Sequence, residues 1–466
     1  MFVGRKRELE LCRKLHASED SAFVPIYGRR RVGKSELILQ FLRGLRGIYV
    51  VGKIAPAPLM IRELLREAAR VLEEPLLAEL PAEGWRTALG HVVDRFKGPG
   101  KLVLALDEFQ WMAKSSPELP GVLQELWDRS WRRSGKVLLI LCGSFIGFME
   151  REVLGKDSPL FGRRTAQILL RPFGFREAAE LHPHWSLDEQ ARAYFVCGGV
   201  PFYHSLFDPR RSLEKNLGDQ LLGEHGPLFR EPDFLLREEL REVESYHAVL
   251  LALAAGEDQM PGIARRASVP ERNLHYYLGQ LTELGYVGKR FPLTSARAPA
   301  RHVRFRLEDP LLRFWFRFVF PNLSQLVRLG PERGYREVVH PELEAWYGGA
   351  FERLCRESLG DVYAREGIAT NYEVGEYWSK SVQIDVVGLR ADRWIDLGEC
   401  KWGSVRSLPS LVRELEEKVA HYPNPSGATI GRLVFVRKKP KGKLGLPPTA
   451  RCYSLEDLAD PTPAIR

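Results

Sequence analysis

A glycine-rich segment near the N-terminus constrains the fold of this chain more than any other feature. Residues 23–35 read FVPIYGRRRVGKS, an apolar run followed by the pattern G-x-x-x-x-G-K-S, and a helix-like run, residues 36–42, comes next. Strand, glycine-rich loop and helix in this order form a phosphate-binding loop, because glycines let successive N–H groups point at phosphate oxygens and the helix N-terminus adds its dipole. The sequence therefore predicts an α/β domain with a parallel sheet that binds a nucleoside triphosphate.

The residue types of this loop indicate how a triphosphate and its Mg²⁺ would be held. We expect Lys34 to reach the β- and γ-phosphates and the Ser35 hydroxyl to ligate Mg²⁺. The alternative is a glycine-rich turn without a ligand, which the flanking strand and helix disfavour. The predicted nucleotide-binding residues of the loop are Gly28, Arg29, Arg30, Arg31, Val32, Gly33, Lys34 and Ser35.

Two carboxylates follow a second apolar run. Residues 102–108 read LVLALDE, which is typical of a strand buried on both faces that ends in Asp107 and Glu108. Ligands of doubly wound sheets lie outside the carboxyl ends of the strands. We therefore expect Asp107 to hold Mg²⁺ through water and Glu108 to polarise the water that attacks the γ-phosphate. Taken alone, the run is equally compatible with an ordinary strand that ends in a polar turn.

Three further residues are candidates to act on the same phosphate. Residues 137–144, VLLILCGS, indicate another buried strand, whose last residue, Ser144, would sense the γ-phosphate. Either Arg163 or Arg164 would stabilise charge in the transition state as an arginine finger, in its own chain or from a neighbouring subunit. The competing interpretation of both arginines is solvated charge or a structural ion pair.

Six short motifs of the first half together resemble the archaeal-type ATPase family, a group of AAA+-related, signal-transducing P-loop ATPases. They are FVGRKREL, GRRRVGKS, LALDEF, LCGS, FGRRT and GGVPFY, at residues 2–9, 28–35, 104–109, 141–144, 161–165 and 198–203. The resemblance implies ATP with Mg²⁺ as the cofactor. It also implies that Val3, Gly4 and Arg5 lie close to the adenine, and that Pro201 faces the nucleotide from a helical lid.

The middle of the chain resembles a winged helix-turn-helix. Residues 236–310 show three helical segments followed by two strands that a Pro/Ala-rich loop joins. In duplex-binding relatives such a domain meets bases and phosphates, which makes double-stranded DNA the expected partner. The alternative is a packing module without a ligand. The candidate recognition residues are Arg272, Asn273, His275 and Tyr276, with Arg301 and Arg304 on the wing.

A second set of charged residues lies near the C-terminus. A hairpin that turns at residues 390–393 would place Asp385 almost opposite Glu399, and Lys401 shares a face with Glu399. A preceding helix carries Glu352. Buried carboxylates require a metal or mutual pairing, and two carboxylates with a lysine suit Mg²⁺-dependent cleavage of phosphodiesters. The alternative is a structural salt bridge.

The pattern D-x₁₃-E-C-K after a helix that carries a glutamate resembles the PD-(D/E)XK nuclease superfamily, although Ile384 stands where the name-giving proline would be. The resemblance implies a restriction-endonuclease-like mixed α/β fold over residues 341–466. Asp385, Glu399 and Glu352 would hold a second Mg²⁺ or Mn²⁺, and Lys401 would be catalytic. The same order of domains resembles a subgroup of the archaeal-type ATPases.

Composition bears on the partners and the cellular location of the protein. The net charge of +9 permits contact with nucleic acid, and residues 432–443 are rich in arginine and lysine, which suits either a DNA backbone or a solvated loop. The six cysteines are scattered, which is typical of the reduced thiols of a cytoplasmic protein. We find no signal peptide and no run of the ~18 apolar residues that a membrane helix needs.

The sequence thus predicts four regions. They are a P-loop ATPase with a helical lid (1–235), a winged helix-turn-helix (236–310), an aromatic helical linker (311–340) and a nuclease-like domain (341–466). The predicted function is an ATP-hydrolysing switch coupled to a domain that binds and cleaves DNA. The alternatives are a signalling ATPase or DNA-binding regulator whose last domain docks a partner, and an ATP-driven remodeller of proteins. Assembly into a homo-oligomer or with a protein partner stays open.

Overall fold

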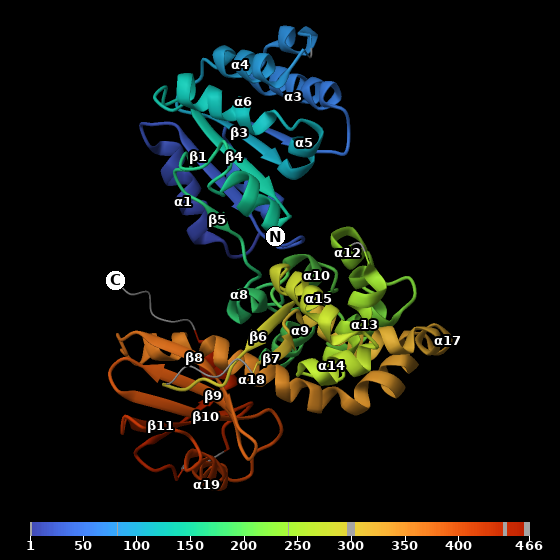
Figure 1. Ribbon diagram of the computed structural model, residues 1–466, viewed down its shortest axis with the longest axis vertical. Helices are drawn as coiled ribbons and strands as arrows, with labels where there is room; N and C mark the ends of the chain where they lie inside the picture. The colour runs from blue at the N-terminus through green and yellow to red at the C-terminus, as the bar shows by residue number, and fades with distance from the viewer. Residues whose placement is uncertain (1, 82, 241, 296–302, 441–444, 461–466) are drawn as a thin grey trace. The chain divides into compact units, whose positions relative to one another are not determined.

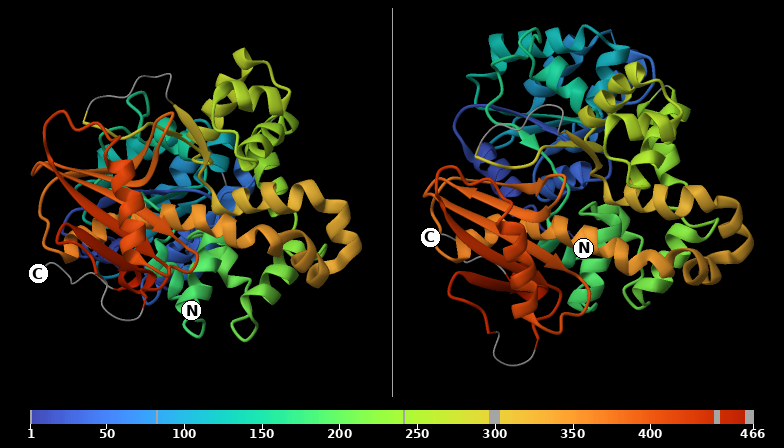
Figure 2. Two further views of the ribbon diagram at one scale, coloured as in Figure 1. Left: turned by 90° about the horizontal axis from the view of Figure 1, so that it is seen from below. Right: turned by 60° about the horizontal axis from the view of Figure 1, so that its bottom comes forward.

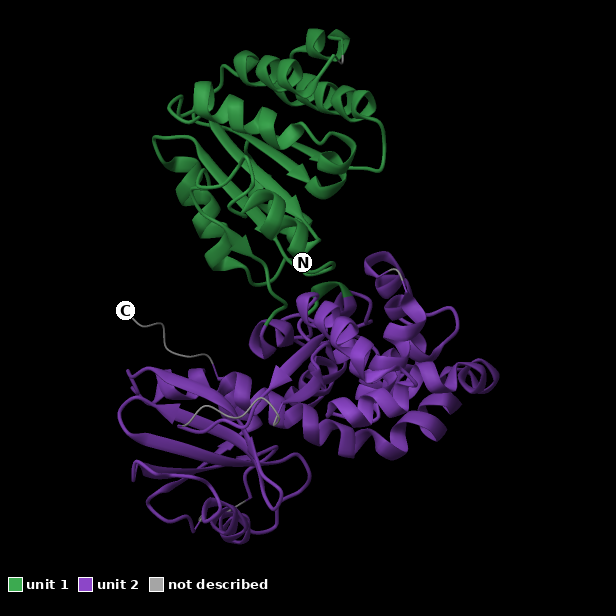
Figure 3. Cartoon of the chain, viewed as in Figure 1, with its two compact units in different colours: residues 1–173, 200–202 green, residues 174–199, 203–466 purple. Residues whose placement is uncertain are grey.

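A computed structural model describes residues 2–81, 83–240, 242–295, 303–440 and 445–460. The chain divides into two compact units, which Figure 3 shows in different colours. Unit 1 consists of residues 1–173 and 200–202, and unit 2 consists of residues 174–199 and 203–466. Each unit is described below by itself.

Unit 1 is built on a parallel sheet of five strands in the order β2-β3-β4-β1-β5 (Figure 1). The strands are β1 Ala22–Tyr27, β2 Gly47–Val51, β3 Leu102–Asp107, β4 Val137–Gly143 and β5 Ile168–Leu169. Every residue of β1, β3 and β4 is buried, as expected for strands that helices cover on both faces. The parallel sheet predicted from the apolar runs is therefore confirmed.

Helices cover both faces of this sheet. The helices are α1 Lys6–Ala17, α2 Lys34–Leu42, α3 Ala57–Leu72, α4 Trp85–Arg95, α5 Phe109–Ser115, α6 Leu119–Leu126 and α7 Ile146–Phe148. Leu9 of α1 and Leu37 of α2 pack with Val24 and Val103 in one core, whereas α3, α4 and α6 pack with the alternate strand residues, such as Phe23, in the other. The sheet has two apolar faces because alternate residues of a strand point to opposite sides.

The register of the strands brings three loops to one edge of the sheet. Strand β4 lies between β1 and β3, with Tyr27 level with Gly143 and Leu106 level with Leu141. The residues that follow these strands, Gly28, Glu108 and Ser144, consequently leave the sheet at the same edge. This edge is the one at which doubly wound sheets bind their ligands.

Unit 2 begins with a helical region. Its helices are α8 Phe175–Ala179, α9 Leu187–Cys197, α10 Pro201–Ser205 (whose first two residues belong to unit 1), α11 Leu213–Leu217, α12 Glu231–Glu239, α13 Val243–Ala254, α14 Met260–Ala267 and α15 Glu271–Glu283. An antiparallel hairpin follows, β6 Val287–Arg290 and β7 Arg304–Leu307. Gly285 adopts a φ of 75° just after α15, the left-handed turn that ends many helices. Three helices and a hairpin thus follow one another as expected, and their classification as a winged helix-turn-helix stays a prediction.

The aromatic segment that follows forms part of the core. Helix α16 spans Pro310–Phe314, α17 spans Leu323–Gly334 and α18 spans His340–Arg365. Phe314, Trp315 and Phe316 are each at most 1% exposed. Gly330, with a φ of 71°, kinks the chain just before Pro331. The aromatic residues therefore stabilise the junction between helices by packing.

The C-terminal region is a mixed sheet in the order β12-β11-β10-β9-β8, drawn orange to red in Figure 2. Its elements are β8 Tyr372–Trp378, β9 Gln383–Arg390, β10 Trp394–Lys401, α19 Leu408–Val419, β11 Thr429–Val436, β12 Ala450–Ser454 and α20 Leu455–Ala459. Strands β8, β9 and β10 pair antiparallel, and β10, β11 and β12 pair parallel. The predicted mixed α/β character is confirmed, and the nuclease-like fold stays a prediction.

The chain that leaves β6 joins the edge of this sheet. The Leu293 amide donates a hydrogen bond of 2.8 Å to the Glu376 carbonyl of β8. The Tyr422 hydroxyl donates to the Leu293 carbonyl at 3.0 Å. The Leu293 side chain packs against the cluster of buried residues that contains Tyr377 and Leu415. The segment that follows β6 therefore packs against the core of the C-terminal sheet.

Among the described residues, none of the helices combines the length and the apolar character that crossing a membrane requires.

Candidate functional sites

The phosphate-binding loop adopts a conformation that two glycines make accessible. Gly28 has a φ of 153°, and a Cβ there would lie 2.2 Å from the Leu170 carbonyl oxygen. Gly33 has a φ of 91° and precedes α2 directly. A side chain at Gly28 would collide with this carbonyl oxygen, and one at Gly33 would strain the left-handed backbone.

The Lys34 ammonium lies inside this loop. It donates hydrogen bonds of 2.9 Å to the carbonyl oxygens of Gly28 and Arg29, and the residue is 6% exposed. Burial lowers the pKa of Lys34, while Glu108 and Asp107 act in the opposite direction. A buried cation held by two neutral carbonyls fits an anionic ligand such as a triphosphate.

The predicted Mg²⁺ residues lie in direct contact. The Ser35 hydroxyl donates a hydrogen bond of 2.6 Å to Oδ2 of Asp107. The Tyr49 hydroxyl donates to the same oxygen at 2.5 Å, and the Glu108 amide donates to Oδ1 at 2.8 Å. The sequence alone gave no reason to single out Tyr49. Its role follows only from the adjacency of β2 and β3.

Glu108 is fixed by two neighbours. It adopts a φ of 49° just before α5, and its Oε2 accepts a hydrogen bond of 2.8 Å from the Ser144 hydroxyl. The Gln110 amide donates to both Glu108 and Ser144. The structure thus brings the two predicted residues together, and it adds Gln110, which sequence reasoning missed. Because Ser144 binds Glu108, it lies where it can orient the carboxylate, and its sensing of the γ-phosphate stays a prediction.

The N-terminal segment contacts the loop from the side. The Arg5 guanidinium donates hydrogen bonds to the carbonyls of Val32 at 3.1 Å and Arg171 at 2.6 Å, and it lies 4.2 Å from the Phe173 ring centroid. Gly4 and Arg5 both have positive φ, and Val3 is 8% exposed. The described contacts of Arg5 are those of a residue that fixes the loop, and its proximity to adenine stays a prediction.

Residues 200–202 return to unit 1 and contact the loop as well. The Arg31 guanidinium lies 4.2 Å from the ring centroid of Phe202. The neighbouring Pro201 begins α10. The structure therefore places Pro201 one residue from a contact with the phosphate-binding loop.

The two candidate arginine fingers differ in their surroundings. Arg163 forms an ion pair of 2.7 Å with Asp128 and donates to the carbonyls of Pro159 and Phe161. Arg164 is exposed. Within unit 1, Arg163 is bound in a structural ion pair, so Arg164 is the better placed of the two to contact another molecule.

The C-terminal carboxylates meet as the hairpin predicts. Gly398 pairs with Val386, so the next position along β9 and β10 sets Asp385 opposite Glu399. The Asp385 carboxylate accepts a hydrogen bond of 3.0 Å from the Cys400 amide. Burial, Glu352 and Glu399 together raise the pKa of Asp385 to about 7. The three predicted carboxylates are therefore close enough to repel one another.

Two further charged residues, which sequence reasoning missed, belong to this cluster. Lys418 of α19 forms an ion pair with Glu399, whose other oxygen lies 3.4 Å from the Lys401 ammonium. Glu376 of β8 is 4% exposed. Over the described part of the chain, no group of three or more His, Cys, Asp or Glu side chains has the arrangement that holds a metal ion. Metal binding by Asp385, Glu399 and Glu352 stays a prediction.

The candidate DNA-binding residues separate into two groups. The exposed face of α15 carries Arg272, Asn273, His275 and Tyr276. On the wing, the Arg304 guanidinium lies 3.3 Å from the Asp258 carboxylate and 4.6 Å from the Trp378 ring centroid, and Arg301 lies outside the described residues. The side chains on this face of α15 are therefore accessible to a partner, whereas the Arg304 guanidinium is held by contacts within the protein.

The basic segment near the C-terminus is largely neutralised within unit 2. Arg432 pairs with Glu416, Arg437 with Asp188 and Lys439 with Asp457. Lys441 and Lys443 lie outside the described residues. The pairing favours a structural role for this segment over contact with a DNA backbone.

Comparison with known families identifies the N-terminal part of the chain. Residues 2–203 match the family described as an ATPase domain predominantly from Archaea. Over these residues the chain is similar to that archaeal ATPase family. Residues 315–414 match a second family, described as archaeal and bacterial proteins of unknown function. Because that description names no activity, the nuclease resemblance beyond the ATPase domain stays a prediction.

Individual relatives match different shares of the chain. The uncharacterized protein MJECL04 of Methanocaldococcus jannaschii is 27% identical over 424 residues, which cover 90% of this chain and 92% of the relative. An uncharacterized ATP-binding protein of the same organism is 48% identical over 42 residues, 9% of this chain and 71% of that protein. The Walker-type ATPase PABY2304 of Pyrococcus abyssi has a similar fold, with a TM-score of 0.53 at 19% identity over 68% of this chain and 96% of that one.

Proposed function

We propose that this protein is an ATP-hydrolysing switch whose remaining domains act on DNA. The observation that carries the ATPase half of the proposal is the contact between Ser35 and Asp107 at 2.6 Å, at the sheet edge that also holds Lys34 and Glu108. These four residues supply the cation, the metal ligands and the base that phosphoryl transfer to water requires.

Each residue has a defined task in this proposal. Lys34 binds the β- and γ-phosphates, and Ser35 and Asp107 hold Mg²⁺, which neutralises phosphate charge when bound. Glu108 accepts the proton of the attacking water, and Ser144 keeps its carboxylate in position. The loop residues 28–33 donate their amides to the phosphate oxygens. Arg164, on this chain or on a neighbouring subunit, stabilises the transferring phosphate.

The test is ATP hydrolysis by the purified protein. Lys34→Ala removes the cation that faces the phosphates, so we expect turnover to disappear and ATP binding to weaken. Lys53→Ala is the matched control, because Lys53 is exposed and pairs with Glu63. Hydrolysis by the Lys34→Ala protein at the wild-type rate would contradict the proposal.

We propose further that helix α15 contacts double-stranded DNA. Leu274, Tyr277 and Leu278 bury one face of the helix, which leaves Arg272, Asn273 and His275 exposed on the other. Contact with phosphates is salt-dependent, and each lost contact lowers the slope of log K against log salt by about 0.9. Arg272→Ala should therefore weaken DNA binding and flatten this slope. Arg333→Ala, which removes an exposed cation paired with Glu337 on α17, should leave both unchanged.

For the C-terminal sheet, we propose Mg²⁺- or Mn²⁺-dependent cleavage of DNA, with Asp385, Glu399 and Glu352 at the metal and Lys401 beside it. The mutual repulsion of buried carboxylates supports this proposal, because a divalent cation would remove it. The ion pair between Lys418 and Glu399 supports the alternative, a regulator whose last domain docks a partner. Cleavage of plasmid and linear DNA in Mg²⁺ or Mn²⁺, with and without ATP, separates the two.

A further inference from the structure

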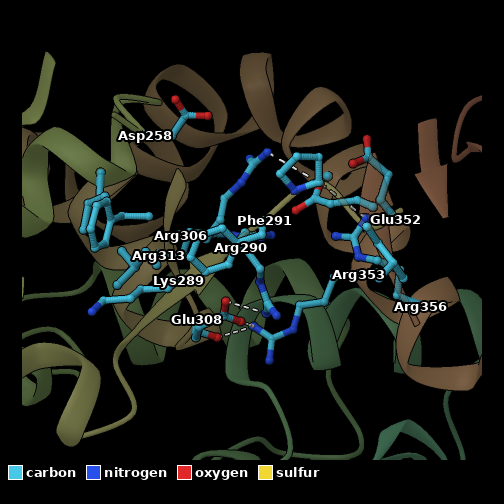
Figure 4. A pocket seen from close by; sticks show the side chains of 18 of the residues that line it. Asp258, Lys289, Arg290, Phe291, Arg306, Glu308, Arg313, Glu352, Arg353 and Arg356 are labelled. Carbon is cyan, nitrogen blue, oxygen red and sulfur yellow. Dashed lines mark hydrogen bonds and ion pairs between the residues drawn. The ribbon is translucent and has the colours of Figure 1, made fainter. Parts of the chain in front are cut away.

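A cavity of about 1050 Å³ lies in unit 2 between the β6–β7 hairpin and helix α18 (Figure 4). Arginines from both elements line it, among them Arg290 and Arg306 from the hairpin and Arg353 and Arg356 from α18. Pockets for small ligands span roughly 300–1000 Å³. The cavity is therefore large enough for a ligand of the size of a nucleotide.

Two side chains that line the cavity carry buried donors without an acceptor. Within the described part of the chain, neither Nε of Arg313 nor Nε1 of Trp346 has a hydrogen-bond partner. The Arg313 guanidinium lies 4.6 Å from the ring centroid of Trp346, and the ion pairs found among the described residues do not include it. A buried guanidinium that forms no close ion pair is costly to the folded state, although Glu308 and Glu352 are near enough to raise the pKa of Arg313. The two donors without a partner therefore indicate a missing acceptor.

The other arginines of the cavity pair with carboxylates, most of which two arginines share, and Arg353 also pairs with Glu357 at 2.6 Å. Glu308 lies between Arg290 and Arg353, as the dashed lines of Figure 4 show. Glu376 lies 3.7 Å from Arg306 and 3.9 Å from Arg356. Burial, followed by the nearby Arg353, lowers the pKa of Arg313 to about 10. The guanidinium groups around Arg313 thus retain donors that a further anion can use.

We propose that this cavity binds the phosphate of a nucleotide, supplied either by a free nucleotide or by the end of a nucleic-acid strand. Guanidinium groups match the geometry of phosphate oxygens and bind them in pairs. Phe291, which is 45% exposed and lines the cavity, offers a face on which a base can stack. Glu352 lines the same cavity, so a strand end would reach the carboxylates of the proposed metal site; this last step rests on the proposed function.

The experiment measures binding of two probes, thymidine monophosphate and a 5′-phosphorylated thymidine trinucleotide. The protein is the full chain, in buffer with EDTA. It carries Lys34→Ala, which weakens nucleotide binding at the phosphate-binding loop. Arg313→Met keeps the side-chain volume and removes the charge. Each probe that binds the parent protein should therefore bind this variant at least ten times more weakly. Because Arg313 takes part in none of the ion pairs found among the described residues, the melting temperature should stay the same or rise by a few degrees. Arg317→Met is the matched control, since Arg317 is exposed and pairs with Glu342.

The outcomes show whether the site binds free nucleotides or strand ends, and which results would overturn the proposal. Equal affinity for both probes assigns the site to free nucleotides, and binding of the trinucleotide alone assigns it to strand ends. Arg313→Met with wild-type affinity, or no binding of either probe to the parent protein, would overturn the proposal. If Arg313→Met does not fold, Lys289→Gln, at an exposed lining residue, takes its place with the same expectation. Because no metal or hydrolysis enters the assay, failure of the proposed ATPase or nuclease leaves its result intact.

Discussion

Ser35 and Asp107 are separated by 72 positions in the sequence, and the Ser35 hydroxyl donates a hydrogen bond of 2.6 Å to the Asp107 carboxylate. The Tyr49 hydroxyl donates to the same oxygen. Asp107 is 1% exposed, so its buried oxygen depends on these two donors for its hydrogen bonds. Three elements, α2, β2 and β3, are joined at this one carboxylate.

Tyr49→Phe should lower the free energy of unfolding. The substitution removes a hydrogen bond to a buried charged group, which is worth about 1.5–3 kcal/mol. Urea denaturation of the two proteins measures the difference. A midpoint equal to that of the wild type would show that the Tyr49 hydroxyl contributes nothing to the stability of unit 1.

Glu108→Gln should retain ATP binding and lose turnover, because an amide cannot accept the proton of the attacking water. General bases contribute about 10²- to 10⁴-fold to rates, and we expect a loss in that range. Ser144→Ala should cost less, since Ser144 only holds the carboxylate. Phosphate release in single-turnover experiments measures both, and an equal loss for the two variants would assign Ser144 a direct role.

Gly28→Ala should prevent the loop from forming. Its Cβ would meet the Leu170 carbonyl oxygen at 2.2 Å, and backbone atoms cannot move aside without distorting β5. Gly90→Ala is the matched control, because a Cβ there meets nothing within 4 Å in helix α4 and should stabilise by up to about 1 kcal/mol. Melting temperatures of both variants check the contrast.

Stability should fall in acid because of a buried histidine pair. His204 Nε2 donates to the Gly198 carbonyl at 2.6 Å, so its Nδ1 accepts from His182 Nε2 at 2.8 Å. Burial lowers the pKa of His182 to about 3 and that of His204 to about 4. Their ordinary value is 6.5, so below that pH the unfolded chain binds more protons than the folded chain.

The contribution of the pair is therefore complete above pH 6.5 and is lost progressively as the pH falls towards 4. Each tenfold difference in proton affinity is worth about 1.4 kcal/mol. His204→Asn keeps a donor for Gly198 and does not titrate, so its stability should vary less between pH 7 and pH 4.5. His184→Gln, at an exposed position, should follow the wild-type curve. The midpoints of urea denaturation, measured between pH 7 and pH 4.5, test this pH dependence of stability.

Mn²⁺ should raise the melting temperature of the wild type and leave Asp385→Asn unchanged, because ligands of the folded state stabilise it by mass action. Asp392→Asn, at an exposed carboxylate paired with Arg390, should respond like the wild type. If Mn²⁺ does not change the melting temperature of the wild type and the protein cleaves no DNA, the result would support the alternative function, a regulator whose last domain docks a partner.

Local patterns in the sequence were sufficient for the sites whose residues follow one another closely. The glycine spacing located Gly28 and Lys34, and the buried runs placed Asp107 and Ser144 at strand ends. The turn at residues 390–393 determined which positions of β9 and β10 meet, so it predicted the pairing of Asp385 with Glu399.

Other residues of the sites were not predictable from local patterns, because their positions depend on the order of strands and on helix packing. Tyr49 contacts Asp107 only because β2 lies beside β3, and Lys418 reaches Glu399 only because α19 packs on β10. The ion pairs of Arg437 and Lys439 could not be predicted from local patterns. Asp188, the partner of Arg437, is distant in the sequence, and Asp457, the partner of Lys439, belongs to another element.

The hydrogen bond between Leu293 and Glu376 has a consequence for how this protein can be divided. Leu293 belongs to the region that would be cloned as a separate DNA-binding module, yet its side chain packs against the core of the C-terminal sheet. A cut before α18 would expose Leu293 to water in the N-terminal fragment. In the C-terminal fragment it would open the edge of β8 to pairing with other chains. Exchange between homologues, in the laboratory or in evolution, must therefore transfer the hairpin and the sheet together.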